Sequence, residues 1–199
     1  MAVIMKLVSK LLLILFIFGL VSVCLPQKVL ALSDEGTTSF QLYQLKANQG
    51  DADAQFNLAL LYYHGLGVTH DSKQTVFWYT KAAEQGHVNA QYSLGSLYRY
   101  SYDAEVPRDY KQAVYWLTKA AEQGHADAQY GLGYMYDYGD EIPQDYKQAF
   151  FWYTKAAEKG HYFAKEHRDE MLEKMSQSQI EEVQKLSKEF YEKIHNKAK

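Results

Sequence analysis

The fold is decided by the stretch Trp78-Tyr79-Thr80-Lys81-Ala82-Ala83-Glu84-Gln85-Gly86-His87, which occurs three times in the chain. It returns with one substitution at residues 116–125 and again at residues 152–161. The tryptophans that open the copies are 38 residues apart (78 to 116) and then 36 residues apart (116 to 152). A fixed period of about 20–50 residues is typical of a stacked array, in which each unit buries its apolar face against its neighbours. Such an array presents a surface, so the repeat favours a binding protein over an enzyme with a catalytic pocket.

Each repeat unit is predicted to contain two helices. In the first helix, apolar or small residues follow the alanine at position 54, 90 or 128 at steps of four, seven and eight, which places them on one helical face. The second helix begins near a residue type that caps helices well, namely Ser72, Asp109 or Asp145. It ends at a glycine that can adopt the left-handed backbone closing a helix, namely Gly86, Gly124 or Gly160.

Three sets of recurring residues are predicted to hold the units together. The tryptophans at positions 78, 116 and 152 are expected in the core, and aromatic residues at positions 56, 92 and 130 are expected between units. Gly95 and Gly133 lie inside the first helices, where glycine costs about 1 kcal/mol relative to alanine. Their recurrence predicts that another backbone passes very close to each of them.

The array is predicted to run from a half repeat to a cap. The half repeat occupies residues 38–50, the full units residues 51–86, 87–124 and 125–160, and a degenerate repeat with C-terminal capping helices residues 161–199. From Ser176 a pattern like a capping box opens a long amphipathic helix, whose apolar side is formed by Ile180, Val183, Leu186, Phe190 and Ile194. This helix is interpreted as a cap that hides the apolar face of the last repeat. The alternative is a helix that docks a second protein.

The first 31 residues have the pattern of a secretory signal peptide. Lys6 and Lys10 precede an apolar run of 15 residues, 11–25, and Ala31 offers a small residue for cleavage. The run is shorter than the roughly 20 apolar residues that span a bilayer, so cleavage is favoured over a retained membrane anchor. Lipid attachment at Cys24 is a further alternative, but Val23 stands where a bacterial lipobox has a small residue. The mature protein is expected to be periplasmic or secreted, with no membrane contact after cleavage.

Cleavage after Ala31 also defines the composition of the mature chain. It removes three lysines and the only cysteine, so the 21 basic residues fall to 18 against 24 acidic ones, a net charge of −6. Because no block of basic residues is present, nucleic acid is not expected as a partner. The mature chain has no disulfide to hold it together and is expected to be a monomer packed around its repeats.

A family resemblance is carried by the unit Ala90-x-x-x-Leu94-Gly95-x-x-Tyr98, a variable loop, Asp109-x-Lys111-x-Ala113-x-x-Trp116 and Lys119-Ala120-Ala121-x-x-Gly124. This unit resembles the Sel-one-like repeat, a relative of the tetratricopeptide repeat, and the resemblance covers residues 40–172. It implies an all-α fold, a right-handed superhelical α-solenoid with a C-terminal capping helix, that mediates protein–protein contacts. The family's Gly-x-Gly-Val loop is intact only at residues 65–68, and the second loop is two residues longer, so the loops are expected to differ in shape.

No catalytic residue, cofactor or metal site is predicted. The chain contains no Ser-x-x-Lys, Gly-x-Ser-x-Gly or His-Glu-x-x-His motif. Histidines at positions 87, 125 and 161 recur one repeat step apart, too far to share a metal at bond lengths of about 2 Å. An acidic cluster leaves calcium open as an alternative, although its last member is better explained as a helix cap; the cluster is Asp137, Asp140, Glu141 and Asp145.

The family also suggests an enzymatic alternative. Cysteine-rich bacterial members have been described as binding or hydrolysing β-lactams, so the rival class is a β-lactam-binding protein or a β-lactam or cell-wall hydrolase. Those members pair cysteines within each repeat, and the mature chain has none to match them.

The predicted site is the non-core face of the first helices. Positions on this face vary between units, whereas packing makes structural positions repeat. In tetratricopeptide-like arrays this face lines the concave groove, and tyrosine and arginine are typical interface anchors. We predict that a protein or peptide binds there; the alternative is an ordinary surface. The predicted contact residues are Asn57, Leu60, Tyr63, Ser93, Ser96, Arg99, Tyr134 and Asp137.

Overall fold

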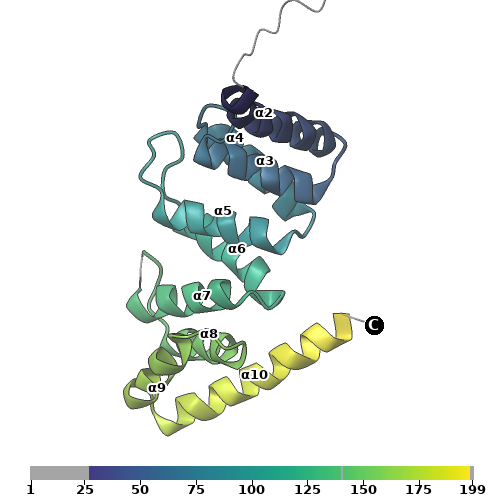
Figure 1. The fold of residues 1–199 in the computed structure, drawn as a ribbon. Coiled ribbons are helices and arrows are strands. Elements are labelled where there is room, and N and C mark those ends of the chain that lie inside the picture. The colour runs from purple at the N-terminus through teal and green to yellow at the C-terminus, as the bar shows by residue number, and fades with distance from the viewer. Residues whose placement is uncertain (1–26, 140, 198–199) are drawn as a thin grey trace, which may run out of the picture.

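The computed structural model describes residues 27–139 and 141–197, which form helices joined by loops (Figure 1). One helix, α2 (Gln27–Asn48), precedes three helix pairs: α3 (Ala52–His64) with α4 (Ser72–Glu84), α5 (Val88–Tyr100) with α6 (Tyr110–Glu122), and α7 (Ala126–Tyr138) with α8 (Tyr146–Glu158). The described chain ends with α9 (Ala164–Lys174) and α10 (Gln177–Lys197). Consecutive helices from α2 to α9 pack on one another, which confirms the predicted all-α solenoid.

Most of the predicted signal peptide lies outside the described residues. Its residues 27–31 form the start of α2, which continues without a break into the predicted half repeat at residues 38–50 and ends at Asn48. Phe40 of α2 meets Tyr62 of α3 with ring centroids 5.6 Å apart, and Ala47 is buried beside them. Helix α2 therefore packs on the first unit as a second helix would. Within the described ranges, no helix is long and apolar enough to cross a membrane.

Most of the predicted helix ends are confirmed, with one correction. Asp109 and Asp145 cap α6 and α8 through their side chains, as expected. In the first unit the cap is Asp71 and not Ser72, because the Asp71 carboxylate accepts the backbone N–H of Gln74 at 2.9 Å. The glycines that follow the second helices have φ values of 89°, 88° and 82°, the left-handed region that glycine tolerates; they are Gly86, Gly124 and Gly160.

The glycines inside the first helices mark close approaches, as predicted, but mainly to side chains. A Cβ on Gly95 would lie 2.8 Å from Leu117 Cγ and 3.0 Å from the Leu117 backbone nitrogen. A Cβ on Gly133 would lie 2.6 Å from the Tyr153 ring. At Gly95 a neighbouring backbone atom comes close, as predicted, and at Gly133 the three nearest atoms all belong to the Tyr153 ring. Both partners follow the repeated tryptophan directly, so each unit fits this side chain against a small residue.

Buried glutamines provide a second periodic contact, which the sequence analysis did not single out. Each lies in the first turn of a first helix and donates its side-chain N–H to an alanine carbonyl near the end of the preceding second helix. Gln91 reaches Ala83 O at 2.9 Å and Gln129 reaches Ala121 O at 3.0 Å. Gln55 makes the same bond to Ala47 O at 3.1 Å, so α2 is tied to α3 in the same way. Satisfying a buried carbonyl at these three junctions fixes the spacing between the units.

The recurring aromatic residues pack between units, as predicted. Each stacks on the histidine at the start of the next unit, with ring centroids 4.6 Å (Phe56 on His87), 4.4 Å (Tyr92 on His125) and 4.2 Å (Tyr130 on His161) apart. Two of these histidines are helix caps as well. His87 Nδ1 accepts Ala90 N–H at 3.1 Å and His125 Nδ1 accepts Ala128 N–H at 3.3 Å.

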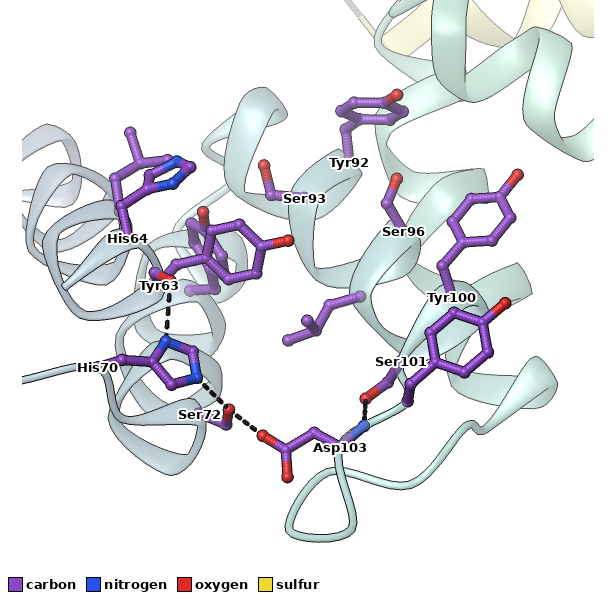
Figure 2. A pocket seen from close by; sticks show the side chains of 14 residues that line it. Tyr63, His64, His70, Ser72, Tyr92, Ser93, Ser96, Tyr100, Ser101 and Asp103 are labelled. Carbon is purple, nitrogen blue, oxygen red and sulfur yellow. Dashed lines mark hydrogen bonds between the residues drawn. The ribbon is translucent and has the colours of Figure 1, made fainter.

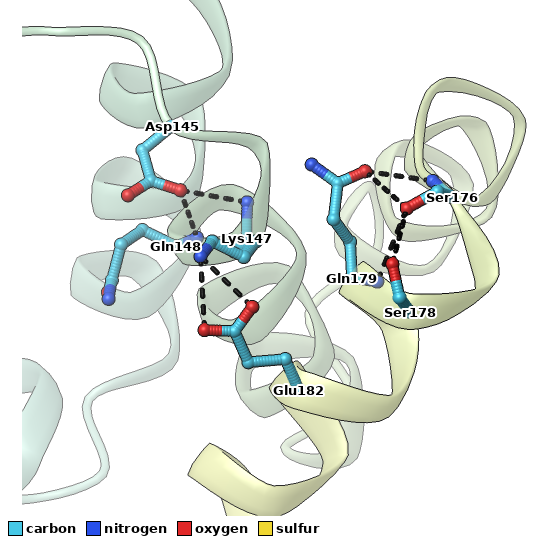
Figure 3. A network of polar contacts seen from close by, with 7 residues as sticks. All are labelled: Asp145, Lys147, Gln148, Ser176, Ser178, Gln179 and Glu182. Atoms are coloured by element: carbon cyan, nitrogen blue, oxygen red, sulfur yellow. Dashed lines mark hydrogen bonds and ion pairs between the residues drawn. The ribbon is translucent and has the colours of Figure 1, made fainter.

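The C-terminal helices cover the last repeat. Met171 of α9, Met175 and Val183 of α10 join the core cluster of α8, which contains Phe151 and Trp152. The predicted capping box is present at the start of α10. Gln179 Oε1 accepts the backbone N–H of Ser176 at 2.8 Å, and Ser176 Oγ accepts the backbone N–H of Gln179 at 3.4 Å (Figure 3). Helix α10 turns back to pack on α8, as expected of a cap.

Trp116→Ala tests the core of the array. Trp116 is buried in the cluster that joins the first and second units, whereas its neighbour Tyr115 is half exposed. We expect Trp116→Ala to lower the free energy of unfolding by ~3–5 kcal/mol, since truncation of a buried tryptophan leaves a cavity. Urea denaturation followed by circular dichroism measures the loss. Tyr115→Ala is the matched control and should change stability by less than about 0.5 kcal/mol; equal losses for both variants would contradict this account of the core.

Candidate protein-binding groove

A first cavity of about 470 Å³ lies between α3, α4 and α5 and is closed at one end by the loops that follow α3 and α5. Figure 2 shows Tyr63 on one wall, Ser93 and Ser96 of α5 on the other, and Tyr100 at the far end. The lining is rich in tyrosine rings and hydroxyl groups. Such a surface offers large apolar contact areas together with hydrogen-bonding groups at their ends.

A second cavity of about 420 Å³ lies between α5 and α7. Tyr92, Ser96 and Tyr100 line both cavities, so the two adjoin along α5. Tyr130 and Tyr134 of α7 form the opposite wall of the second cavity. The two cavities together are called the groove below. The groove follows the first helices across three successive units, as expected for an array of this kind.

The groove collects most, but not all, of the predicted site residues. Leu60, Tyr63, Ser93 and Ser96 line the first cavity, and Ser96, Arg99 and Tyr134 line the second. Asn57 lines neither cavity, and its side-chain N–H donates to Asp53 O within the same helix at 2.7 Å. Asp137 also lies outside both. Prediction from the sequence missed several lining residues, which are a repeated aromatic residue (Tyr92), the last residues of two helices (His64 and Tyr100) and loop residues (His70 and Tyr102).

Arg99 and Asp137 are buried, which corrects their prediction as exposed interface residues. Arg99 is 5% exposed, and its guanidinium carbon lies 4.6 Å from the Tyr100 ring centroid and 4.8 Å from that of Tyr134. It therefore positions two tyrosines of the groove. Asp137 is 3% exposed, and its Oδ1 lies 3.3 Å from Lys174 Nζ. The equivalent residue of the first unit, Tyr63, is 45% exposed, so the neighbours of each unit and not the position on the helix decide its burial.

The longer second loop folds back onto the first unit and forms the rim of the first cavity. Ser72 Oγ donates a hydrogen bond to Asp103, and Lys73 Nζ lies 3.0 Å from Glu105 Oε1 (Figure 2 shows the first of these). The hydrogen bond from Ser72, with a second from the Glu105 backbone, lowers the pKa of the Asp103 carboxyl below its ordinary value. These contacts with the first unit provide a physical reason for the predicted difference in the shape of this loop.

The rim brings a serine, a histidine and an aspartate together, but in a different order of contacts from that of a Ser-His-Asp catalytic triad. In a catalytic triad the aspartate holds the histidine, whose other nitrogen takes the serine proton. Here Ser72 Oγ donates a hydrogen bond to Asp103 and also lies 3.1 Å from His70 Nε2, while His70 Nδ1 lies 2.8 Å from the Tyr63 backbone oxygen (Figure 2). Ser72 is also buried. The histidine is therefore oriented by a backbone carbonyl and not by the aspartate, which accepts the hydrogen bond of the serine instead.

The acidic residues considered for calcium are engaged elsewhere or lie apart. Asp137 pairs with Lys174, and the Asp145 carboxylate caps α8 by accepting the backbone N–H of Gln148 at 3.1 Å. Asp140 lies outside the described residues. Over residues 27–139 and 141–197, no group of three or more acidic, histidine or cysteine side chains is close enough to hold a metal ion.

The histidines at the unit junctions have different electrostatic surroundings. His87 Nε2 lies 3.2 Å from Asp53 Oδ1, and His161 Nε2 lies 3.4 Å from Asp127 Oδ1. At the equivalent position facing His125 the chain has Asn89. Burial lowers the pKa of His125 below its ordinary value of 6.5, because desolvation disfavours the charged ring.

Comparison with known proteins identifies the repeat. A Sel1 repeat family model matches residues 52–87, 88–125 and 126–161, which together make up more than half of the chain. The chain belongs to the Sel1 repeat family. Proteins of this family generally mediate protein–protein interactions. Each matched repeat begins one residue after the corresponding predicted unit, at the first residue of α3, α5 or α7.

Individual relatives share the repeat but are longer or differ outside it. A Sel1 repeat protein from Oxalobacter formigenes, known from its crystal structure, is 36% identical and superposes with a TM-score of 0.58 over 65% of this chain and 56% of that one. Chitin synthase regulatory factor 3 of Schizosaccharomyces pombe is 37% identical over 70 residues, 35% of this chain and 8% of that protein. HRD3A, an ERAD-associated E3 ubiquitin-protein ligase component of Arabidopsis thaliana, is 34% identical over 65 residues, 32% of this chain and 10% of that protein. The likeness to the last two is therefore confined to a small part of each.

Asn89→Asp tests the electrostatic account of the Sel1 junctions. The neutral ring of His125 is favoured in the folded state, so its contribution to stability is full above about pH 6.5 and is lost as the pH falls through the lowered folded pKa. A carboxylate at position 89 should favour the charged ring and raise the pKa of His125, which an NMR titration of the ring protons measures. Asn89→Ala is the control. An equal change in the pKa of His125 in both variants would refute the proposed effect of charge.

Proposed function

We propose that this Sel1 repeat protein is an exported adaptor, which binds a protein or peptide segment in the groove and does not convert it chemically. The observation that carries the proposal is the continuous row of tyrosine and serine side chains along the first helices of three repeats. Tyrosine is enriched in protein interfaces because its rigid ring buries much surface and its hydroxyl still finds a partner. Membership of a family that generally mediates protein–protein contacts supports the same reading.

The groove is built to stay in place when a partner binds. Tyr92 is held by the stack on His125, and Tyr100 and Tyr134 are held on either side of Arg99. Side chains that are already ordered lose little conformational freedom on binding, which favours affinity. The first cavity is bounded by the loop carrying Asp103, which is bonded to the neighbouring unit. A preformed groove suits a binding module.

Localisation and assembly are part of the proposal. The apolar run at residues 11–25, followed by the small residue Ala31, supports export by a signal peptide to the periplasm or the medium. We infer that the exported chain acts as a monomer, with the protein partner as its binding target. The hydrolase alternative is less well supported by the rim, because Ser72 is buried and donates its hydrogen bond to Asp103, while a backbone carbonyl and not an aspartate holds His70.

Substitutions in the groove test the binding role. Tyr63 and Tyr102 are exposed on the wall and rim of the first cavity. A photo-crosslinking amino acid at position 96, between the two cavities, should capture the partner in the envelope fraction of the native cell. Combined Tyr63→Ser and Tyr102→Ser changes should then weaken binding of the captured partner at least tenfold, as expected for central interface tyrosines, measured by biolayer interferometry.

The matched control is Tyr162→Ser, which removes an equally exposed tyrosine that lines neither cavity. Binding that is unchanged in the groove variant but lost in the control would place the interface elsewhere. The purified protein should also leave nitrocefin and muropeptides intact. Hydrolysis that Ser72→Ala abolishes, with folding unchanged, would replace the adaptor by the enzymatic alternative.

Export has its own measurement. Mass spectrometry of the mature protein from the native cell should give an N-terminus at Leu32 or within a few residues of it, because signal peptidases cut after small residues such as Ala31. A protein that retains Met1 or Met5 would contradict cleavage. A lipid on Cys24 would contradict the cleavage site and leave export standing.

A further inference from the structure

The three repeats carry the same stripe of side chains on one side of each second helix. The stripe consists of a lysine and a glutamine, an aromatic residue four positions after the lysine, and a second lysine four positions further on. These spacings place all four side chains on one face of a helix. The stripe comprises Lys73, Gln74, Phe77 and Lys81 on α4; Lys111, Gln112, Tyr115 and Lys119 on α6; and Lys147, Gln148, Phe151 and Lys155 on α8.

Only the third stripe is covered. Phe151 is 5% exposed, whereas Tyr115 is 50% and Phe77 is 47% exposed. The second lysine of each stripe shows the same difference in exposure, since Lys155 is buried and Lys119 is exposed. Helices α6 and α8 have equivalent neighbours within the array, and α10 is the element that packs on α8 in addition (Figure 1). The lower exposure of the stripe on α8 therefore identifies it as the surface that α10 covers.

The contacts of α10 show what chemistry this stripe accepts. Ile180, Val183 and Leu186 lie on one side of α10 and pack against the cluster that contains Phe151. Beside them the Glu182 carboxylate oxygens lie 3.1 and 3.2 Å from Lys147 Nζ (Figure 3). The occupant is thus an amphipathic helix with apolar residues at intervals of three and a glutamate next to them. The stripe on α8 supplies an aromatic ring between two lysines.

The equivalent stripe on α6 is complete and uncovered. Tyr115 is half exposed, Lys111 and Lys119 are exposed on either side of it, and Lys119 Nζ lies 5.5 Å above the Tyr115 ring. On α4 the corresponding site differs, because Lys73 is already paired with Glu105 of the long second loop at 3.0 Å. The first lysine is therefore engaged on α4 and available on α6.

We propose that the stripe on α6 is a second docking site, which binds an amphipathic helix of another protein, with a glutamate beside its apolar residues, in the way that α8 binds α10. The occupant presents apolar residues spaced like Ile180, Val183 and Leu186, and its glutamate pairs with Lys111. Binding covers the Tyr115 ring, which gains the apolar burial that Phe151 already has. This site lies on the second helices and is separate from the groove, which the first helices line.

A labelled helix of known sequence tests the proposal on the full chain. The probe is a fluorescein-labelled synthetic peptide with the sequence of residues 176–197, and its anisotropy reports binding. We expect the peptide to bind the full-length protein in trans, and Tyr115→Ala to weaken it at least tenfold. Phe77→Ala is the matched control on α4, where Lys73 is engaged, and should leave the affinity unchanged.

Charge reversal separates specific pairing from a general apolar contact. Lys111→Glu should weaken the peptide several-fold, and a peptide with Glu182→Lys should bind Lys111→Glu more tightly than it binds the unaltered protein. The combined Tyr63→Ser and Tyr102→Ser variant should bind the peptide normally, so the test does not depend on the groove. Failure of the peptide to bind, an affinity that Tyr115→Ala does not change, or no rescue by the reversed pair would each overturn the proposal.

Discussion

The array depends on one fit, that of a side chain from each second helix against a small residue of the first helix. Leu117 fills the space above Gly95, and the Tyr153 ring lies against Gly133 so closely that a Cβ would overlap it. In the first unit Tyr79 and Ala59 are buried in the same cluster. Dense interiors cannot absorb even a methyl group without movement. The two helices of a unit are therefore fixed at one separation, and every surface built on them inherits that geometry.

The junctions between units add polar contacts that also fix the spacing between neighbouring helices. A buried glutamine bonds the carbonyl of the preceding unit, and a histidine stacks on an aromatic ring while capping the next helix. Each junction thus satisfies groups that would be costly to bury without a partner. Because these contacts repeat, they set a common spacing and leave the character of the groove to positions that do not repeat. Arg99 of the second unit is one such residue, with Tyr100 and Tyr134 on either side of it.

Two faces of the molecule follow from this division. The first helices form a groove of tyrosines and serines, and the second helices present a repeated stripe of lysines around an aromatic residue. On α8 the chain covers its own stripe with α10, which ends the array and adds an ion pair between Glu182 and Lys147. The C-terminal cap is therefore also an internal example of how this surface binds a helix. Because each unit of a repeat protein packs only on its neighbours in the row, both faces of the array remain available for binding.

The sequence by itself determined the period, the pairing of helices, the helix caps at Asp109 and Asp145 and the capping helix, because these rest on local patterns that recur. It also indicated the groove, since Tyr63, Ser93, Ser96 and Tyr134 vary on a helix face whose other positions repeat. Only the tertiary structure decided which variable residues are accessible. Arg99 and Asp137 share that face by spacing, but the rings of Tyr100 and Tyr134 cover Arg99, and the buried Asp137 pairs with Lys174 of α9. The contact of Ser72 with Asp103 and the covering of Phe151 by α10 likewise join residues about thirty positions apart, for which no local pattern exists.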